Sequence, residues 1–240
     1  MSGRVYVGCA TWAIGAANDH LLPRVPGGNL ARYAARLTAA EVNSSFHRQH
    51  RHATWGRWAR SVGPGFRFSV KLPKAITHER RLVGVEELLD AFAAEVRMLG
   101  EKLAVVLVQL PPSLAFDRDA FVAFDAQLRR RVPDAAVAVE PRHPSWFEDD
   151  VDAFLAERRA ARVAADPAVV PRAADPGGWP GLRYFRLHGS PVTYRSSYPD
   201  EYLDALAARL EPGDWCIFDN TASGAALGNA VGLLERLRSG

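Results

Sequence analysis

Cysteine is nearly absent from this chain of 240 residues, which holds only Cys9 and Cys216. Two thiols exclude a disulfide framework and a metal site built on thiolates. Each cysteine stands inside an apolar run, so we expect both to be reduced and buried as small hydrophobic side chains.

Long hydrophobic runs are also absent. The longest unbroken apolar stretch, Leu103 to Val108, falls far short of the roughly 18 residues that a membrane helix needs. The first ten residues lack the charged and then apolar layout of a secretory signal. We therefore predict a cytoplasmic protein without a membrane partner.

Lysine is scarce, because 27 arginines and only three lysines supply the positive charge. The formal net charge is +3, and such a mildly basic surface is compatible with anionic partners without requiring one. Hydrophobic residues make up 48% of the chain and charged residues 24%, which is an ordinary globular balance and excludes a disordered or collagen-like chain.

The chain shows no internal repeat, no low-complexity tract and no Gly/Ser-rich linker, so residues 1–240 are predicted to form a single domain. Short β-branched or aromatic runs alternate with stretches that have apolar residues at helical spacing. The strand-like runs are 5–10, 40–45, 66–72, 103–110, 135–141, 162–166, 182–188 and 215–219.

Seven helices are expected between these strands, and residues 167–181, rich in proline and glycine, are expected to be irregular. Eight alternating units in about 240 residues predict an α/β fold, a single (β/α)8 TIM barrel. An open, doubly wound sheet is the alternative, although the Gly-rich turn that often follows its first strand is missing. The helix ranges are 29–38, 53–61, 85–99, 117–131, 148–160, 200–210 and 225–238, with Asn29, Thr54, Asp117 and Asp200 as capping residues.

Several predicted strands have one polar face, which is unusual for parallel strands buried on both sides. Side chains alternate along a strand, so Arg67, Ser69 and Lys71 share one face. The same alternation places Glu41 with Asn43, Glu140 with Arg142, and Tyr184 with Arg186 and His188. Because helices cover the outside of a barrel, these polar faces are predicted to point inward.

The polar residues gather toward the carboxyl ends of the strands, which form the catalytic end of a TIM barrel. Lys71, Arg142 and Arg186 outnumber Glu41 and Glu140, which favours an anionic ligand. A closed ion-pair network with a purely structural role is the alternative. The polar residues at the strand ends are Thr11, Asn43, Lys71, Gln109, Arg142, His143, Asp166, His188, Asp219 and Asn220.

Six motifs in order along the chain together resemble the YecE-like family, a domain of unknown function. The resemblance implies a TIM barrel and no established reaction. The chain departs from the family pattern at His47, where tyrosine is usual, and at Pro141, which removes a backbone donor. The motifs are Glu41 to Phe46; Phe68 to Lys74 with Ile76 to Glu79; Gln109 to Ser113; Val139 to His143 with Trp146; Arg186 to Gly189; and Phe218 to Thr221 with Asn229 and Ala230.

Two further patterns carry weaker hypotheses. Residues 46–52, followed by Trp55 and Trp58, combine cations with aromatic rings as a nucleic-acid groove does, but the favoured and simpler interpretation is a solvated loop whose tryptophans belong to the next helix. Metal-ligand residue types also occur at the strand ends, but the interleaved cations would repel a divalent ion, so no metal site is predicted. These types are Glu41, Glu140, His143, Asp166, His188 and Asp219.

The favoured function is an enzyme that binds a phosphorylated or other anionic small molecule at the barrel mouth, with phosphoester or sugar-phosphate chemistry. The alternatives are a nucleic-acid-binding or endonuclease-like protein, with or without a metal, and a non-catalytic scaffold. The sequence does not identify a cofactor or the oligomeric state. Candidate catalytic residues are Glu140, His188, Lys71 and His78, and candidate ligand-binding residues are Glu41, Asn43, Gln109, Arg142, His143, Arg186, Asp219 and Asn220.

Overall fold

The computed structural model describes residues 3–239, and all eight predicted strand positions hold strands. The sixth strand begins earlier than predicted and is interrupted at Val163. The irregular stretch 167–181 contributes one short strand, β8, that the sequence pattern did not predict. The bounds are β1 Tyr6–Cys9, β2 Ala39–Val42, β3 Arg67–Lys71, β4 Leu103–Gln109, β5 Ala136–Glu140, β6 Ala160–Arg162, β7 Ala164–Asp166, β8 Gly177–Gly178, β9 Tyr184–Leu187 and β10 Trp215–Phe218.

The strands form two hydrogen-bonded sheets, which confirms the predicted α/β fold with parallel strands but not its closure into a single barrel. One sheet has the order β1-β10-β9-β7 and the other β2-β3-β4-β5-β6-β8. Every pair is parallel except β6 with β8. The chain passes directly from β6 to β7 through Val163, whose N–H still bonds to Val139 of β5, so the two sheets meet at this residue.

The second junction between the sheets lies between β1 and β2, where side chains supplement a backbone hydrogen bond of 3.2 Å from the N–H of Thr38 to the carbonyl of Val7. The Thr38 hydroxyl accepts a hydrogen bond of 2.7 Å from the backbone N–H of Val7. The Tyr33 hydroxyl accepts one of 2.7 Å from the N–H of Cys9 and donates one of 3.0 Å to the carbonyl of Ala39. These groups satisfy backbone atoms that a closed barrel would pair directly.

Seven α-helices occupy the predicted positions. They are α1 Asn29–Ala34, α2 His52–Arg60, α3 Glu86–Val96, α4 Arg118–Arg131, α5 Asp149–Glu157, α6 Asp200–Ala207 and α7 Ala225–Ser239. The shorter elements are the 3-10 helices η1 Ala16–Leu21, η2 Ser44–Phe46, η4 Arg97–Lys102, η5 Pro144–Phe147 and η6 Pro171–Ala174, and the π-helix η3 Ala75–Glu79.

Only one of the four predicted capping residues caps a helix with its side chain. Asp117 accepts a hydrogen bond of 3.0 Å from the N–H of Ala120 at the start of α4. Asn29 and Asp200 are instead the first residues of α1 and α6, and Thr54 lies inside the first turn of α2. In all three helices the N-cap lies one or more residues before the predicted capping residue, at Gly28, Arg51 and Pro199.

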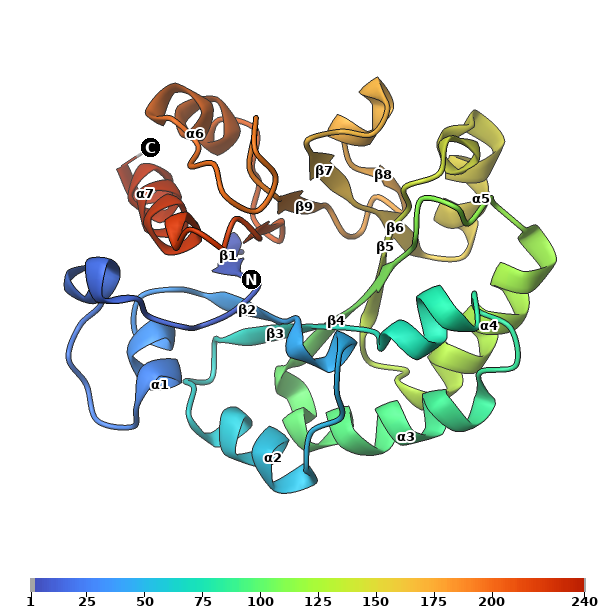
Figure 1. Cartoon of the computed structure of the whole chain (residues 1–240), viewed down its shortest axis with the longest axis horizontal. Helices are drawn as coiled ribbons and strands as arrows, with labels where there is room; N and C mark the ends of the chain where they lie inside the picture. The colour runs from blue at the N-terminus through green and yellow to red at the C-terminus, as the bar shows by residue number, and fades with distance from the viewer. Residues whose placement is uncertain (1–2, 240) are drawn as a thin grey trace.

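The helices lie outside the strands (Figure 1), and this arrangement creates two apolar cores. The larger core fills the space between strands and helices and includes Phe68, Val70 and both cysteines, which are free and buried as predicted. The smaller core lies inside the ring of strands and includes Leu107, Tyr184 and other inward side chains. The inner core gives way to charged groups toward the carboxyl ends of the strands.

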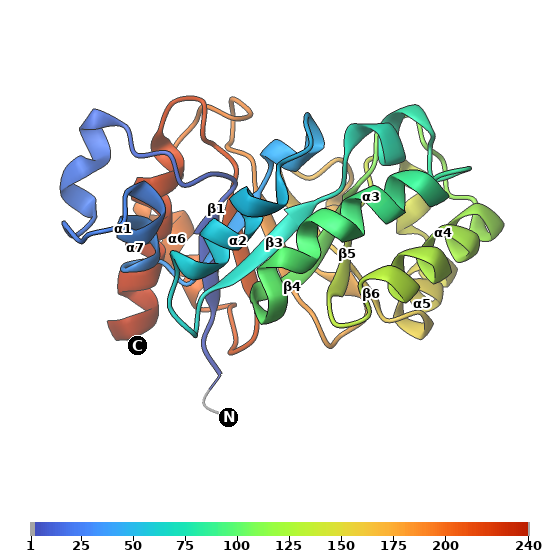
Figure 2. The ribbon, with the colours of Figure 1, turned by 90° about the horizontal axis from the view of Figure 1, so that it is seen from below.

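The two ends of the strand ring carry different parts of the chain. Figure 2 shows the N-terminus on the lower side of the molecule, where β1 begins. Because the other main strands run parallel to β1 or to β2 within their sheets, the loops that follow them share the opposite end. We call this opposite end, at the carboxyl ends of the strands, the mouth.

Candidate functional site

Arg186 of β9 stands at the centre of an ion-pair network inside the strand ring. Its side chain is almost completely buried and contacts three carboxylates. Nε and Nη2 donate to Glu41 of β2 at 2.9 and 2.7 Å, and Nη1 donates to Glu140 of β5 at 2.7 Å. Nη2 also donates to Asp219 at 3.0 Å, just after β10. Charged groups from four strand ends therefore converge as strand alternation predicts.

His188 bridges two of the same carboxylates. Its Nδ1 lies 3.0 Å from Asp219 and its Nε2 lies 3.1 Å from Glu140. Tyr184 completes the lower part of the network, with its hydroxyl 3.0 Å from Glu41 and 2.9 Å from Ser69. We call Glu41, Glu140, Arg186, His188 and Asp219 the buried network.

The charges in the buried network stabilise one another. Burial alone would raise the pKa of Glu140, but Arg186 and His188 outweigh it and hold that pKa well below its usual range. Burial likewise lowers the pKa of His188, yet Glu140 and Asp219 outweigh it and leave the pKa raised. When His188 is protonated it can donate from both nitrogens, and the network then combines an imidazolium and a guanidinium with three carboxylates.

A second group of cations lies at the mouth beside this network. Lys71 ends β3, is only 6% exposed, and holds its Nζ 3.9 Å from the ring centroid of Phe46. Among residues 3–239, no group accepts a hydrogen bond from this ammonium. Burial and Arg186 lower the pKa of Lys71 to about 8, despite the attraction of Glu41 and Glu140. Lys71 is therefore a buried cation that remains unpaired.

Arg142 and His78 extend this cationic group. Arg142 bonds to one oxygen of Glu140 over 3.3 and 3.2 Å, and its side chain is about one quarter exposed, at 27%. His78, in η3, is half-buried, with Nδ1 2.8 Å from the hydroxyl of Thr77. Burial, then Lys71 and Arg142, lower the pKa of His78. We call Lys71, His78 and Arg142 the mouth cations.

The other predicted ligand-binding residues lie at strand ends with different local partners. His143 uses Nδ1 to accept the N–H of Ser145 at the start of η5. Gln109 is buried and is paired in register with Glu140, whereas Asn43 keeps a buried Oδ1 without a hydrogen-bond partner. The predicted set is thus dispersed around the mouth, with the buried network and the mouth cations at its centre.

Asn220 anchors the loop that follows β9. Its Nδ2 donates to the carbonyl of Ser196 at 2.8 Å and to Oδ1 of Asn229 at 2.9 Å. Asp166 does not belong to the inward set, because it lies beside Tyr198 and Tyr202. Burial and then Asp166 raise the pKa of both tyrosines.

A small cavity opens beside Arg142, with a volume of about 180 Å³. Tyr194, which the sequence interpretation did not single out, is part of its wall and lies edge-on to His188 at 5.8 Å between ring centroids. A loop residue has no periodic pattern, so only its aromatic character could have drawn attention to it. The lining residues are Glu140, Pro141, Arg142, Ala165, Pro167, Val169, His188, Thr193 and Tyr194.

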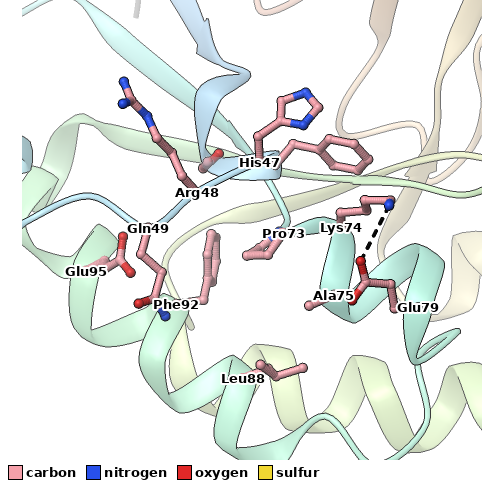
Figure 3. Close-up of a pocket in the computed structure, with 12 residues that line it drawn as sticks. His47, Arg48, Gln49, Pro73, Lys74, Ala75, Glu79, Leu88, Phe92 and Glu95 are labelled. Carbon is pink, nitrogen blue, oxygen red and sulfur yellow. Dashed lines mark ion pairs between the residues drawn. The ribbon is translucent and has the colours of Figure 1, made fainter.

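A wider groove of about 560 Å³ lies between η2, η3 and α3. Figure 3 shows His47 and Arg48 on one side of it, Leu88 and Phe92 of α3 on another, and the 3.5 Å ion pair of Lys74 with Glu79. Lys71 is separated from this groove by the ring of Phe46, which covers its ammonium.

The tryptophans after residues 46–52 pack into the protein, as the simpler interpretation of that stretch expects. Trp55 is fully buried and donates Nε1 to Glu95 at 3.1 Å. Trp58 packs edge-on against Trp12 and His50, with ring centroids 4.9 and 5.0 Å apart. Trp55 therefore offers no exposed ring on which a base could stack.

Within the described part of the chain, no three or more His, Cys, Asp or Glu side chains are grouped so as to hold a metal ion. Glu140, His188 and Asp219 do meet, but Arg186 lies among them. No helix in residues 3–239 is both long and apolar enough to span a membrane.

Comparison with known proteins confirms the family resemblance. The sequence model of the family "Protein of unknown function DUF72" matches residues 6–240. The UPF0759 protein YecE of Escherichia coli (strain K12) is 24% identical over 167 residues, which are 68% of this chain and 59% of YecE. The matched part thus spans less than two thirds of that relative's length.

Solved structures support the architecture. A DUF72 family protein of Thermotoga maritima MSB8 superposes with a TM-score of 0.76 at 26% identity, and the match covers 98% of this chain and 99% of that one. The structure of SacUVDE superposes with a TM-score of 0.58 at 11% identity, covering 98% and 99% of the two chains. At that identity the second likeness shows a shared fold alone.

Proposed function

This chain belongs to the DUF72 family of unknown function, and we propose that it is an enzyme whose mouth cations bind an oxyanion group of a small ligand, with phosphate as the favoured group. Lys71 carries this proposal, because its side chain is largely buried, which lowers its pKa to about 8, while no described protein group accepts a hydrogen bond from its ammonium. An anion bound beside it would supply the missing partner. The family and the fold leave the ligand open.

The division of roles follows from which charges are already used. Arg186 donates to three carboxylates and is fully buried, so we assign it and the other network residues to positioning. Lys71 offers a compact charge, and Arg142 offers the part of its guanidinium that is not bonded to Glu140 or Tyr194. Two cations of different shape suit the several oxygens of a phosphate.

Proton transfer is assigned to His78 in this proposal. Burial, and then Lys71 and Arg142, lower its pKa below the ordinary 6.5, so its imidazole is neutral near pH 7 and can accept a proton. Glu140 is the weaker candidate, because its pKa lies well below the usual range and three cationic side chains share its oxygens. Glu140 instead orients Arg142 and His188.

Calorimetric titration with inorganic phosphate tests the binding step. Charge-assisted hydrogen bonds contribute about 1.5–3 kcal/mol each, so Lys71→Met and Arg142→Met should each weaken binding by about tenfold or more. Arg24→Met is the control, because Arg24 is 89% exposed and pairs only with Asp19. Equal phosphate affinity in all four proteins, or no binding to the wild type, would refute the proposal.

Turnover provides the test of catalysis. A panel of phosphate monoesters should be converted by the wild type, and His78→Gln should lower kcat while phosphate affinity stays within about threefold of the wild type. Binding without turnover of any ester would leave an anion-binding protein and contradict the assignment as an enzyme. A steep fall of affinity for single-stranded DNA with salt, together with no response to phosphate, would favour the nucleic-acid alternative.

A further inference from the structure

The cavity beside Arg142 has mainly apolar walls. Pro141, Ala165, Pro167 and Val169 contribute no side-chain hydrogen-bonding group, and Tyr194 contributes its ring. The polar atoms of His188 that border the cavity already face Glu140 and Asp219. The Tyr194 hydroxyl bonds to Arg142, whose pKa burial lowers but Glu140 and then Tyr194 raise, so Thr193 supplies the hydroxyl that a ligand inside the cavity could reach.

Exposed apolar side chains extend this wall outward. Among the described residues only five large hydrophobic side chains are strongly exposed, and two of them, Val169 at 49% and Tyr194 at 41%, line the cavity. Val192, which is 53% exposed, belongs to the same loop as Tyr194 but does not line the cavity. An apolar rim joined to an apolar hollow marks a place where an apolar group can leave water.

Tyr194 is held in an uncommon backbone conformation. Its φ of +67° lies in the left-handed region, which an aromatic residue rarely adopts. Two backbone hydrogen bonds fix it there: its N–H donates to the carbonyl of His188, and its carbonyl accepts from the N–H of Ala222 at 3.0 Å. Backbone strain kept by such bonds is frequent at ligand sites, and it presets the position of the ring.

The position of Arg142 joins the cavity to the anion site. Arg142 lines the cavity, and its charge also reaches His78 together with that of Lys71. A ligand with its oxyanion on the mouth cations can therefore extend directly into the apolar space. At about 180 Å³ the cavity is smaller than the 300–1,000 Å³ typical of sites for whole drug-sized ligands, so it suits one ring or a short chain.

We infer that the ligand is a phosphate monoester of an aromatic or aliphatic alcohol, whose apolar body lies between Tyr194 and Val169. This inference rests on the proposed oxyanion site and makes it more specific. A sugar phosphate would place several hydroxyl groups against walls whose polar side chains, apart from Thr193, already bond to other protein groups, and unpaired polar groups weaken binding strongly. The inference thus separates apolar esters from the sugar phosphates that the mouth cations alone would also accept.

Calorimetric titrations of the full chain with inorganic phosphate, phenyl phosphate and ribose 5-phosphate test this inference. Phenyl phosphate should bind the wild type about tenfold more tightly than inorganic phosphate, the gain that burial of about 60 Å² of apolar surface yields. Tyr194→Asn removes the ring while keeping a residue that tolerates positive φ, and Val169→Ser shortens the opposite wall. Both should reduce the preference to below about threefold, and Val169→Ser, which leaves the contact of Tyr194 with Arg142 in place, should change phosphate affinity little.

Val192→Ser is the matched control, since it removes an equally exposed valine outside the cavity and should keep the tenfold preference. Ribose 5-phosphate binding as tightly as phenyl phosphate, or equal binding of phenyl phosphate and phosphate, would overturn the inference and leave the oxyanion site intact. No binding of either phosphate or phenyl phosphate would overturn the proposed function itself, and the inference with it.

Discussion

The buried network and the mouth cations lie next to each other but differ in how their charges are satisfied. Arg186 is enclosed by Glu41, Glu140 and Asp219, with four donor contacts between 2.7 and 3.0 Å. Lys71 is nearly as deeply buried, yet its Nζ has only the face of Phe46. Burial alone thus does not distinguish a structural charge from one that is available to a ligand.

The contrast has a consequence for stability. Removing one member of a saturated, buried set leaves charges without partners, which is strongly destabilising. Removing an unpaired buried cation leaves nothing newly unpaired and also removes its desolvation penalty. Anion affinity should show the opposite order: removing the unpaired cation should weaken it more than removing a member of the saturated set, because the unpaired cation is the one that a ligand can use.

Arg186→Met should produce the largest loss of stability. It leaves three buried carboxylates without their central guanidinium, so the free energy of unfolding should fall by about 3–5 kcal/mol. Lys71→Met is the matched substitution and should change that free energy by less than about 1 kcal/mol. Urea denaturation followed by circular dichroism measures both, and equal effects would remove the distinction between the two regions.

His188 should make stability depend on pH. Its pKa in the folded state is raised above the ordinary 6.5, so its contribution is complete below pH 6.5 and is lost as the pH rises through the folded-state pKa. His188→Gln should abolish this part of the pH profile and cost about 1.5–3 kcal/mol at pH 6, where hydrogen bonds to both carboxylates are lost.

Chemical denaturation of the wild type and His188→Gln between pH 5.5 and 8.5 supplies the comparison. The difference in the free energy of unfolding between the two proteins isolates the contribution of His188. Lys71, whose pKa of about 8 makes stability rise with pH above that value, is present in both proteins, so its contribution cancels. A difference that is constant across this range would mean that His188 is not protonated inside the network.

Tyr184→Phe should give the smallest effect of the three. The hydroxyl bonds to Glu41 and Ser69, but Glu41 keeps both of its contacts with Arg186. A cost of about 1 kcal/mol in the free energy of unfolding is expected, with phosphate affinity unchanged. Altered phosphate affinity in this variant would show that the network does more than hold the mouth in place.

Strand alternation predicted the inward set well, because the side chains of a strand alternate whatever surrounds it. It brought Glu41, Glu140, Arg186 and His188 together from three separate strands. The count of charges was less complete, since it compared three cations with two glutamates. Asp219 is a third carboxylate, and His188, whose pKa is raised, is a fourth cation when it is protonated.

Other features depend on contacts that no local pattern carries. The junction of β1 and β2 uses the side chains of Thr38 and Tyr33, which periodicity cannot distinguish from ordinary helix and turn residues. Tyr194 owes its place to a left-handed backbone and to bonds with His188 and Ala222. Sequence reasoning finds faces of strands, whereas loop positions are decided by tertiary contacts.

The titration of Lys71 itself, with and without an anion, tests the central claim most directly. The chain has only three lysines, so lysine labelled with 13C at the ε position gives three NMR signals, which Lys71→Met assigns in part. Sulfate suits the titration because its charge does not change between pH 6 and 10. We expect Lys71 to titrate near pH 8 without sulfate, and its pKa to rise by about one unit or more at saturation, while those of Lys74 and Lys102 do not move. A Lys71 signal that titrates identically with and without sulfate would contradict the assignment of this residue to an anion site.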